Sequence, residues 1–241
     1  MPTIQAIFLL MSYYVIVLAA IPIAVKAFTR VPREIIRKFQ HIGYAMSVFI
    51  LLEYFETWTH ALLALAVLVI LAYPFLWGFE RTKWFKKVLV QRRETGELRK
   101  QLLFVQMSYA FLILVFWGLM GEAGKPIMAT GVMAWGYGDA MAALLGKAFG
   151  KRYIDDPHIR PRKTYVGTVS MALAAAITVL FMARFYMEVS WLIALVIVVF
   201  ASPVAALTEL YAQDGADTLV VPASVAVTIY IVLEGLQWLI M

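Results

Sequence analysis

Residues Trp191–Leu207 read WLIALVIVVFASPVAAL, a run of 17 positions without a charged side chain. A helix needs about 20 mostly apolar residues to cross the hydrocarbon core of a bilayer. This run nearly reaches that length, and comparable runs recur along the whole chain. The pattern therefore predicts an all-α, polytopic membrane protein.

Eight stretches are long and apolar enough, or nearly so, to be transmembrane helices. They are Ile4–Ala27, Gln40–Phe55, Thr59–Phe79, Leu102–Met120, Pro126–Phe149, Tyr165–Phe185, Trp191–Leu207 and Thr218–Ile240. The first run lacks a basic segment before it, so we expect a retained span rather than a cleaved signal peptide.

The overall composition agrees with a membrane protein. Of 241 residues, 63% are hydrophobic and only 15% are charged, and the mean hydropathy is +0.82. These values exclude a soluble globular class. There is no cysteine, which excludes disulfides and thiolate metal sites. The net charge of +6 predicts attraction to anionic phospholipids.

The basic residues are unevenly distributed between the predicted loops. If eight spans alternate in direction, loops 28–40, 80–101, 150–164 and 208–217 share one side of the membrane. With the segment ends counted, the first three contain 19 of the 21 Lys and Arg residues. The positive-inside rule then makes this side cytoplasmic and puts both termini on the opposite side.

Asp139 is a charged residue in the middle of a predicted span, where ionisable groups are costly and usually functional. Gly136 and Gly138 precede it and favour a break in the helix. A helix restarting at Asp139 would direct its free N–H groups at a phosphate. The alternative is simple packing, because Ala134, Gly138, Ala142, Gly146 and Gly150 repeat every four residues and allow close helix approach.

Two loops downstream have opposite charge. Six cations lie between Lys147 and Lys163, a pattern that also suits a simple anchor for phospholipid head groups. The loop at 208–217 has no cation and contains three carboxylates, Glu209, Asp214 and Asp217. Carboxylates can pair with the basic loop, but with Asp139 they are also the oxygen ligands that Mg²⁺ prefers. Magnesium beside cations is suited to phosphoryl transfer.

Two further features have a structural and a functional interpretation. His41 lies where the second predicted span enters the membrane, either as an interfacial hydrogen-bonding group or as a base for a lipid hydroxyl. The basic segment 80–101 is interpreted as an amphipathic segment on anionic lipid. No nucleic-acid recognition motif accompanies it, so nucleic-acid binding is not expected.

Taken together, four separated motifs resemble the polyprenol kinase family of membrane enzymes, which includes phytol, dolichol and CTP-dependent diacylglycerol kinases. They are Arg37-Lys-Phe-Gln-His41, Gly138-Asp139 through Gly150-Lys151, Lys163-Thr164-Tyr-Val-Gly167-Thr168, and Glu209 followed by Asp217-Thr-Leu-Val-Val-Pro222. The resemblance covers most of the chain from residue 33 and is weakest over 1–32. It implies a single integral membrane domain spanning 1–241.

The resemblance implies a CTP-dependent kinase that phosphorylates an isoprenoid alcohol, with Mg²⁺ as cofactor. Asp139, Glu209 and Asp217 would hold the metal, and His41, Asp139 and Lys163 would be catalytic. The nucleotide would contact a further set of residues: Gly138, Gly150, Lys151, Arg162, Thr164 and Gly167. Thr218 departs from the family pattern, which usually has Asn at this position.

Three alternatives remain open at the level of sequence. The related enzymes that make CDP-diacylglycerol share the Gly-Asp and Lys-Thr-x-x-Gly elements, although their C-terminal signature is missing here. A transporter would also explain an intramembrane Asp139. A lipid-binding scaffold would tolerate Asp139→Asn without biochemical loss beyond stability.

Overall fold

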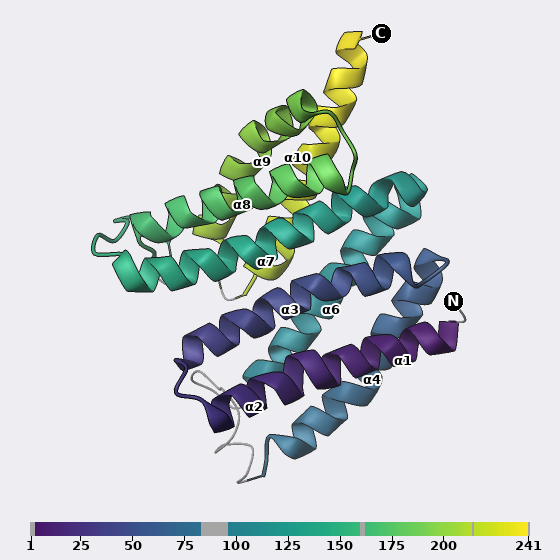
Figure 1. Ribbon diagram of the computed structural model, residues 1–241, viewed down its shortest axis with the longest axis vertical. Helices are drawn as coiled ribbons and strands as arrows, with labels where there is room; N and C mark the ends of the chain where they lie inside the picture. The colour runs from purple at the N-terminus through teal and green to yellow at the C-terminus, as the bar shows by residue number, and fades with distance from the viewer. Residues whose placement is uncertain (1–2, 83–95, 160–161, 214, 241) are drawn as a thin grey trace. The chain divides into compact units, whose positions relative to one another are not determined.

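The computed structural model describes residues 3–82, 96–159, 162–213 and 215–240. Within these ranges the chain is helical apart from short connections and one isolated β-bridge, which confirms the all-α prediction. The helices form two compact units, Met1–Leu114 and Val115–Met241, and each is described by itself (Figure 1).

The described residues of the first unit form four long helical segments. They are α1 (Thr3–Tyr13) with the π-helical η1 (Tyr14–Ala20) and α2 (Ile21–Phe28), then α3 (Arg33–Glu53), α4 (Trp58–Phe79) and α6 (Glu97–Leu112). The last of these continues into the π-helical η2 (Ile113–Gly118), which leads into the second unit.

Pro22 explains the irregular turn in the first helical segment. Proline has no N–H and cannot give the carbonyl of Leu18 the hydrogen bond of a regular α-helix. The side chain of Gln40 on α3 donates to this carbonyl instead, at 2.8 Å. The π-helical turn is thereby tied to α3.

Polar side chains are buried between the helices of the first unit. The Gln106 amide on α6 donates to the Tyr14 hydroxyl at 2.8 Å, and this hydroxyl lies 3.4 Å from that of Ser47. Tyr109 donates to the backbone oxygen of Tyr44 at 2.5 Å. These bonds connect α6 with η1 and α3.

In the second unit, the described residues form the short η3 (Gly121–Ala123) and four long helices. They are α7 (Gly124–Phe149), α8 (Tyr165–Phe185), α9 (Trp191–Tyr211) and α10 (Asp217–Ile240). α7 packs against α8 and α10, and α9 also packs against both α8 and α10. Small residues permit these contacts: a Cβ added at Gly138 would lie 2.5 Å from the sulfur of Met171 on α8, and one at Gly131 2.4 Å from the backbone oxygen of Pro222 on α10.

Six helical segments in the described residues are long and apolar enough to cross a membrane. They are Thr3–Phe28, Trp58–Phe79, Arg99–Gly118, Tyr165–Phe185, Trp191–Tyr211 and Asp217–Trp238. These segments support an integral multi-pass protein. The remaining two long helices, α3 and α7, coincide with the other two predicted spans but contain more polar and small residues.

Three details of the prediction are wrong. α7 is continuous through Gly136, Gly138 and Asp139, and Gly138 packs against Met171 of α8 instead of ending the helix. α3 begins at Arg33, so most of the predicted loop 28–40 is helical. α9 ends only at Tyr211, which puts Glu209 on its last turn rather than in a loop.

The basic segment 80–101 is described at its two ends. Residues 83–95 lie outside the described part of the chain, and with them Lys83, Lys86, Lys87, Arg92 and Arg93. α6 begins at Glu97, and its Arg99 forms an ion pair of 2.7 Å with the buried Glu80 that follows α4.

Candidate functional site

The connection between α7 and α8 folds back on itself. An antiparallel β-bridge joins Tyr153 to Thr164, and the Ile154 N–H donates to the Lys163 carbonyl at 2.9 Å. The Tyr165 N–H donates to the Arg152 carbonyl at 3.3 Å. This closure returns Lys163 and Thr164 to the end of α7.

Thr164 lies at the centre of a tight junction between α7 and α8. Its hydroxyl caps α8 by accepting from the Gly167 N–H at 3.1 Å, as N-terminal capping residues do. A Cβ added at Gly150 would lie 2.5 Å from this hydroxyl, and one at Gly146 3.1 Å from it. The structure therefore brings the predicted nucleotide contacts Gly150, Thr164 and Gly167 together. Packing accounts for their small size, and their contact with a nucleotide stays a prediction.

Lys163 connects this junction to α9. Its ammonium donates to the Glu209 carboxylate at 2.8 Å and also to the Glu209 backbone oxygen. The Glu209 residue is only 8% exposed. The two residues predicted from separate motifs thus form one protected ion pair.

Asp139 and Asp217 lie near this pair. Both carboxylates are close enough to Glu209 for their charges to act on it. Asp217 begins α10, and one of its carboxylate oxygens accepts from the Trp135 indole at 3.4 Å. Three helices, α7, α9 and α10, therefore contribute one carboxylate each to the surroundings of Lys163.

The carboxylates fit a magnesium ion in chemistry but do not form a closed cage. Among the described residues, no three Asp, Glu, His or Cys side chains are close enough together to hold a metal. Asp214 lies outside them. Mg²⁺ is commonly bound by one or two carboxylates, with substrate phosphates completing the coordination. An incomplete protein ligand set of oxygens is therefore compatible with a magnesium–nucleotide complex.

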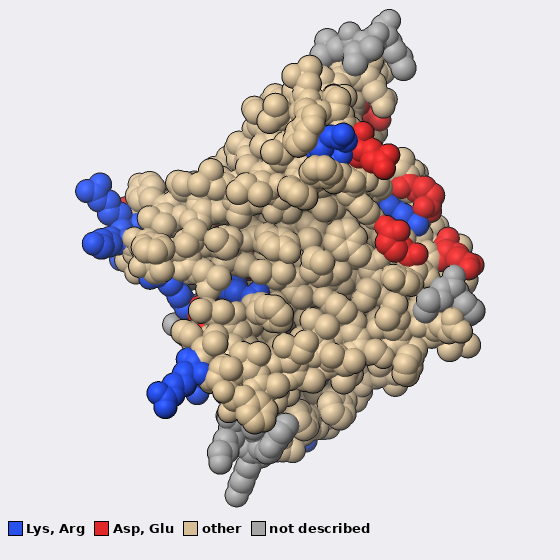
Figure 2. All heavy atoms as spheres, viewed as in Figure 1, with Lys and Arg blue, Asp and Glu red and all other residues tan. Residues whose placement is uncertain are grey.

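Exposed cations surround the α7–α8 connection. Figure 2 shows Lys and Arg side chains at the edge of the second unit where α7 ends. Lys147, Lys151, Arg152 and Arg162 are all exposed there, whereas Lys163 is half-buried. Lys151 and Arg162, the predicted phosphate contacts, are thus accessible from water.

Two residues that the sequence did not single out attach the connection to the end of α9. The Gln213 amide donates to the His158 carbonyl at 2.9 Å, and the Tyr211 hydroxyl lies 3.4 Å from the Asp156 carboxylate. The His158 backbone N–H donates to Asp156 at 2.8 Å, and mainly for this reason the pKa of Asp156 is lowered. The only signal in the sequence is an aromatic and an amide beside three carboxylates, which is too general to identify a contact.

His41 belongs to the first unit. It lies on α3 and is 6% exposed, close in sequence to the buried Lys38. Its neighbour Gln40 has the structural role at Leu18 described above. A role of His41 in catalysis stays a prediction from its motif.

These features define a class: a multi-pass helical membrane protein in which one compact unit brings carboxylates of α7, α9 and α10 near Lys163 and has exposed cations at its α7–α8 connection. Over 195 residues the chain is 29% identical to a phytol kinase of the cyanobacterium Synechocystis, covering 79% of this chain and 76% of the relative. No family model matches the chain, and no solved structure matches it. The similarity supports a relationship to phytol kinase-like lipid-alcohol kinases.

Proposed function

We propose that this protein is a CTP-dependent kinase that transfers the γ-phosphoryl group of CTP to the hydroxyl of an isoprenoid alcohol. The observation that carries the proposal is that Lys163, Glu209, Asp139 and Asp217 lie close together within the second unit. These residues come from three separate family-like motifs. The similarity to a phytol kinase supports the choice of a lipid alcohol as acceptor.

The reaction forms a bond between the alcohol oxygen and the γ-phosphorus and breaks the bond between this phosphorus and the β–γ bridging oxygen. CDP leaves with that oxygen, and the hydroxyl proton passes to a base. Such a transfer needs mainly positioning and neutralisation of negative charge. The base that we propose is His41, an assignment that rests on its sequence motif alone.

The residues of the second unit have distinct roles in this proposal. Lys151 and Arg162 attract the nucleotide from water, because both are exposed. Lys163 moves from Glu209 to a phosphate when the nucleotide binds. A Mg²⁺ ion that neutralises phosphate charge would be held by one or two of the carboxylates Asp139, Glu209 and Asp217, with the phosphates completing its coordination. Gly138 packs against Met171 and Gly150 against Thr164, so their proposed part is to position α7 beside the nucleotide.

The test is transfer of label from γ-labelled CTP into chloroform-extractable lipid, with purified protein and Mg²⁺. The acceptors are phytol, geranylgeraniol, farnesol, a polyprenol, a dolichol and diacylglycerol. We expect label in at least one isoprenoid alcohol and release of an equal amount of CDP. Asp139→Asn abolishes the transfer, because it removes a charged ligand without changing the size of the side chain.

Asp155→Asn is the matched control, since Asp155 is exposed on the same unit and has no part in the proposed site. It should retain full activity. Release of pyrophosphate with a lipid phosphate as acceptor would identify a cytidylyltransferase instead. An absence of both products with every acceptor would contradict an enzymatic role and favour transport.

A further inference from the structure

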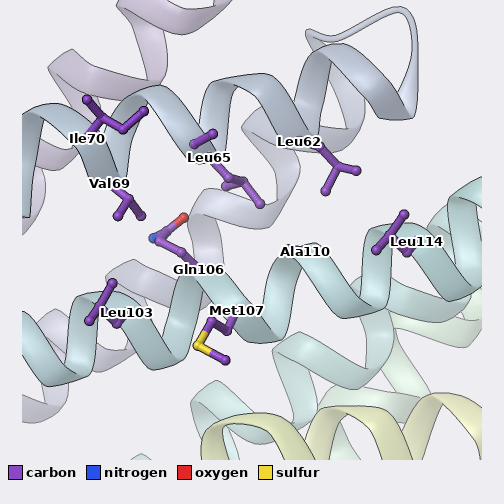
Figure 3. A pocket seen from close by; sticks show the side chains of 10 residues that line it. Leu62, Leu65, Val69, Ile70, Leu103, Gln106, Met107, Ala110 and Leu114 are labelled. Carbon is purple, nitrogen blue, oxygen red and sulfur yellow. The ribbon is translucent and has the colours of Figure 1, made fainter.

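An apolar groove of about 470 Å³ lies between α4 and α6 of the first unit. Its walls include Leu62, Leu65 and Val69 of α4 and Leu103, Met107 and Leu114 of α6. Figure 3 shows these side chains on facing sides of the two helices. The volume lies in the range of about 300–1,000 Å³ typical of small-molecule sites.

Among the described residues of this lining, Gln106 is the one with a polar side chain. Its side chain extends from α6 toward Leu65 and Val69 on α4 (Figure 3). The residue is only 3% exposed. Its amide nitrogen donates to the Tyr14 hydroxyl at 2.8 Å, while its Oε1 has no hydrogen-bond donor among the described residues. The wall of the groove therefore contains one buried acceptor that has no donor in the described part of the chain.

The depth of Gln106 makes this acceptor unusual. Gln106 lies near the middle of the candidate span Arg99–Gly118, and the facing part of α4 lies within the span Trp58–Phe79. Water is scarce at such a depth, so an unsatisfied amide oxygen costs free energy that a bound donor can recover. None of the described residues that line the groove is Lys, Arg, Asp or Glu, so their chemistry does not suit a phosphate or an ammonium group.

We propose that this groove binds a single-chain lipid alcohol, whose hydroxyl donates to Oε1 of Gln106 and whose hydrocarbon chain lies along the α4–α6 walls. An alcohol supplies one neutral donor and a long apolar chain, which are the two features that the groove complements. The binding site itself does not depend on the proposed kinase activity. That the bound alcohol is also the kinase substrate rests on the proposed function.

The lining of the groove separates this site from the transfer of phosphate. Among the described residues it contains no cation and no carboxylate that could hold a nucleotide or its metal ion. Gln106 itself is nine residues from the first residue of α6, which is about 14 Å along the helix axis. The groove is therefore proposed to hold the alcohol before or after the reaction.

The test uses purified protein in phosphatidylcholine nanodiscs without nucleotide, so a failure of kinase activity cannot affect it. The probe is a C20 isoprenoid alcohol with a diazirine in its chain, and the matched probe is its methyl ether, which has no donor. After photolysis, mass spectrometry locates the labelled peptides. We expect the alcohol to label peptides within 62–70 and 103–114, in competition with unlabelled geranylgeraniol and not with its methyl ether.

Three variants sharpen the test. Gln106→Leu lowers labelling by the alcohol about fivefold or more, the order expected for one lost hydrogen bond, and leaves the ether unaffected. Ala66→Trp fills the groove from its exposed position on α4 and blocks labelling with Gln106 intact. Gln101→Leu is the matched control, because Gln101 is on α6 outside the lining, and it should label like wild type.

Equal labelling by alcohol and ether in the wild-type protein would overturn the proposal, and so would labelling outside the two peptides. Unchanged labelling of Ala66→Trp would do the same. If the groove escapes photolabelling only at high protein concentration, and crosslinks form between copies of the chain, the groove is an interface between chains and the proposal is overturned. If Gln106→Leu fails to fold, the comparison of probes on the wild type and Ala66→Trp still decides.

Discussion

α7 and α8 meet through glycines, whereas α4 and α6 face each other through large aliphatic side chains. A Cβ at Gly146 would approach the Cα of Gly167 to 3.1 Å, so the first pair has no room for a side chain. The second pair leaves a groove of about 470 Å³. The difference follows from residue size at the contact. Small residues close the α7–α8 pair beside the charged site, whereas large residues leave the α4–α6 pair open enough for a ligand.

The largest expected effect concerns the ion pair of the second unit. Lys163→Met leaves the Glu209 carboxylate buried without its cation, which lowers the free energy of unfolding by about 3 kcal/mol and abolishes phosphate transfer. Thermal unfolding in detergent and the label-transfer assay measure the two losses.

The double variant Lys163→Met/Glu209→Gln is the control for this prediction. It removes both charges, so we expect it to recover most of the stability and none of the activity. Recovered activity would show that Lys163 serves only to pair with Glu209.

A matched pair of glycine substitutions tests the packing comparison directly. Gly150→Ala places a Cβ 2.2 Å from the Gly146 backbone oxygen and should cost about 1–3 kcal/mol. Gly78→Ala, on α4 of the first unit, meets nothing within 4 Å and should raise stability by up to about 1 kcal/mol through helix propensity. Equal effects in thermal unfolding would contradict the proposed difference between the two units.

The cap of α8 should give a smaller effect. Thr164→Ala removes the acceptor for the Gly167 N–H and should lower the free energy of unfolding by about 1 kcal/mol. Thr164→Ser retains the hydroxyl and should remain close to wild type. If the serine variant loses as much stability as the alanine variant, the methyl group of Thr164 and not its hydroxyl holds the junction.

The smallest effect is the pH dependence of the α7–α8 connection. The pKa of Asp156 is lowered mainly by the hydrogen bond from the His158 N–H. The ionised carboxylate therefore stabilises the folded connection above the ordinary carboxyl pKa, and this stabilisation is lost as the pH falls through the lowered pKa. Exchange of the His158 amide with deuterium, corrected for its intrinsic pH dependence, should accelerate over that acidic interval. Asp156→Asn should remove this dependence, and Asp155→Asn should keep it.

The sequence predicted most helices because an apolar run of sufficient length leaves few alternatives in a bilayer. Tyr165–Phe185 was predicted with the bounds that the structure has. The expected break at Asp139 is wrong because helix propensity ignores the neighbouring helix against which Gly138 packs. A local pattern thus predicts an element more reliably than its irregularities.

The site was predictable only in part. Lys163 and Glu209 come from motifs 46 residues apart, and only the fold shows that they pair. Gln106 gave no signal, because one amide in an apolar run has no periodic pattern and its partner Tyr14 lies 92 residues away. Contacts at such separations depend on the arrangement of helices, which one sequence does not contain.

The hydrogen bond from Gln40 to the Leu18 carbonyl has a consequence for biogenesis. Pro22 has no N–H and cannot form the regular α-helical bond to this carbonyl. The Gln40 donor replaces it only when α3 lies beside the first hydrophobic segment. An incompletely bonded carbonyl is disfavoured in lipid. The first hydrophobic segment and α3 are therefore suited to enter the membrane together, as a helical hairpin, rather than one after the other.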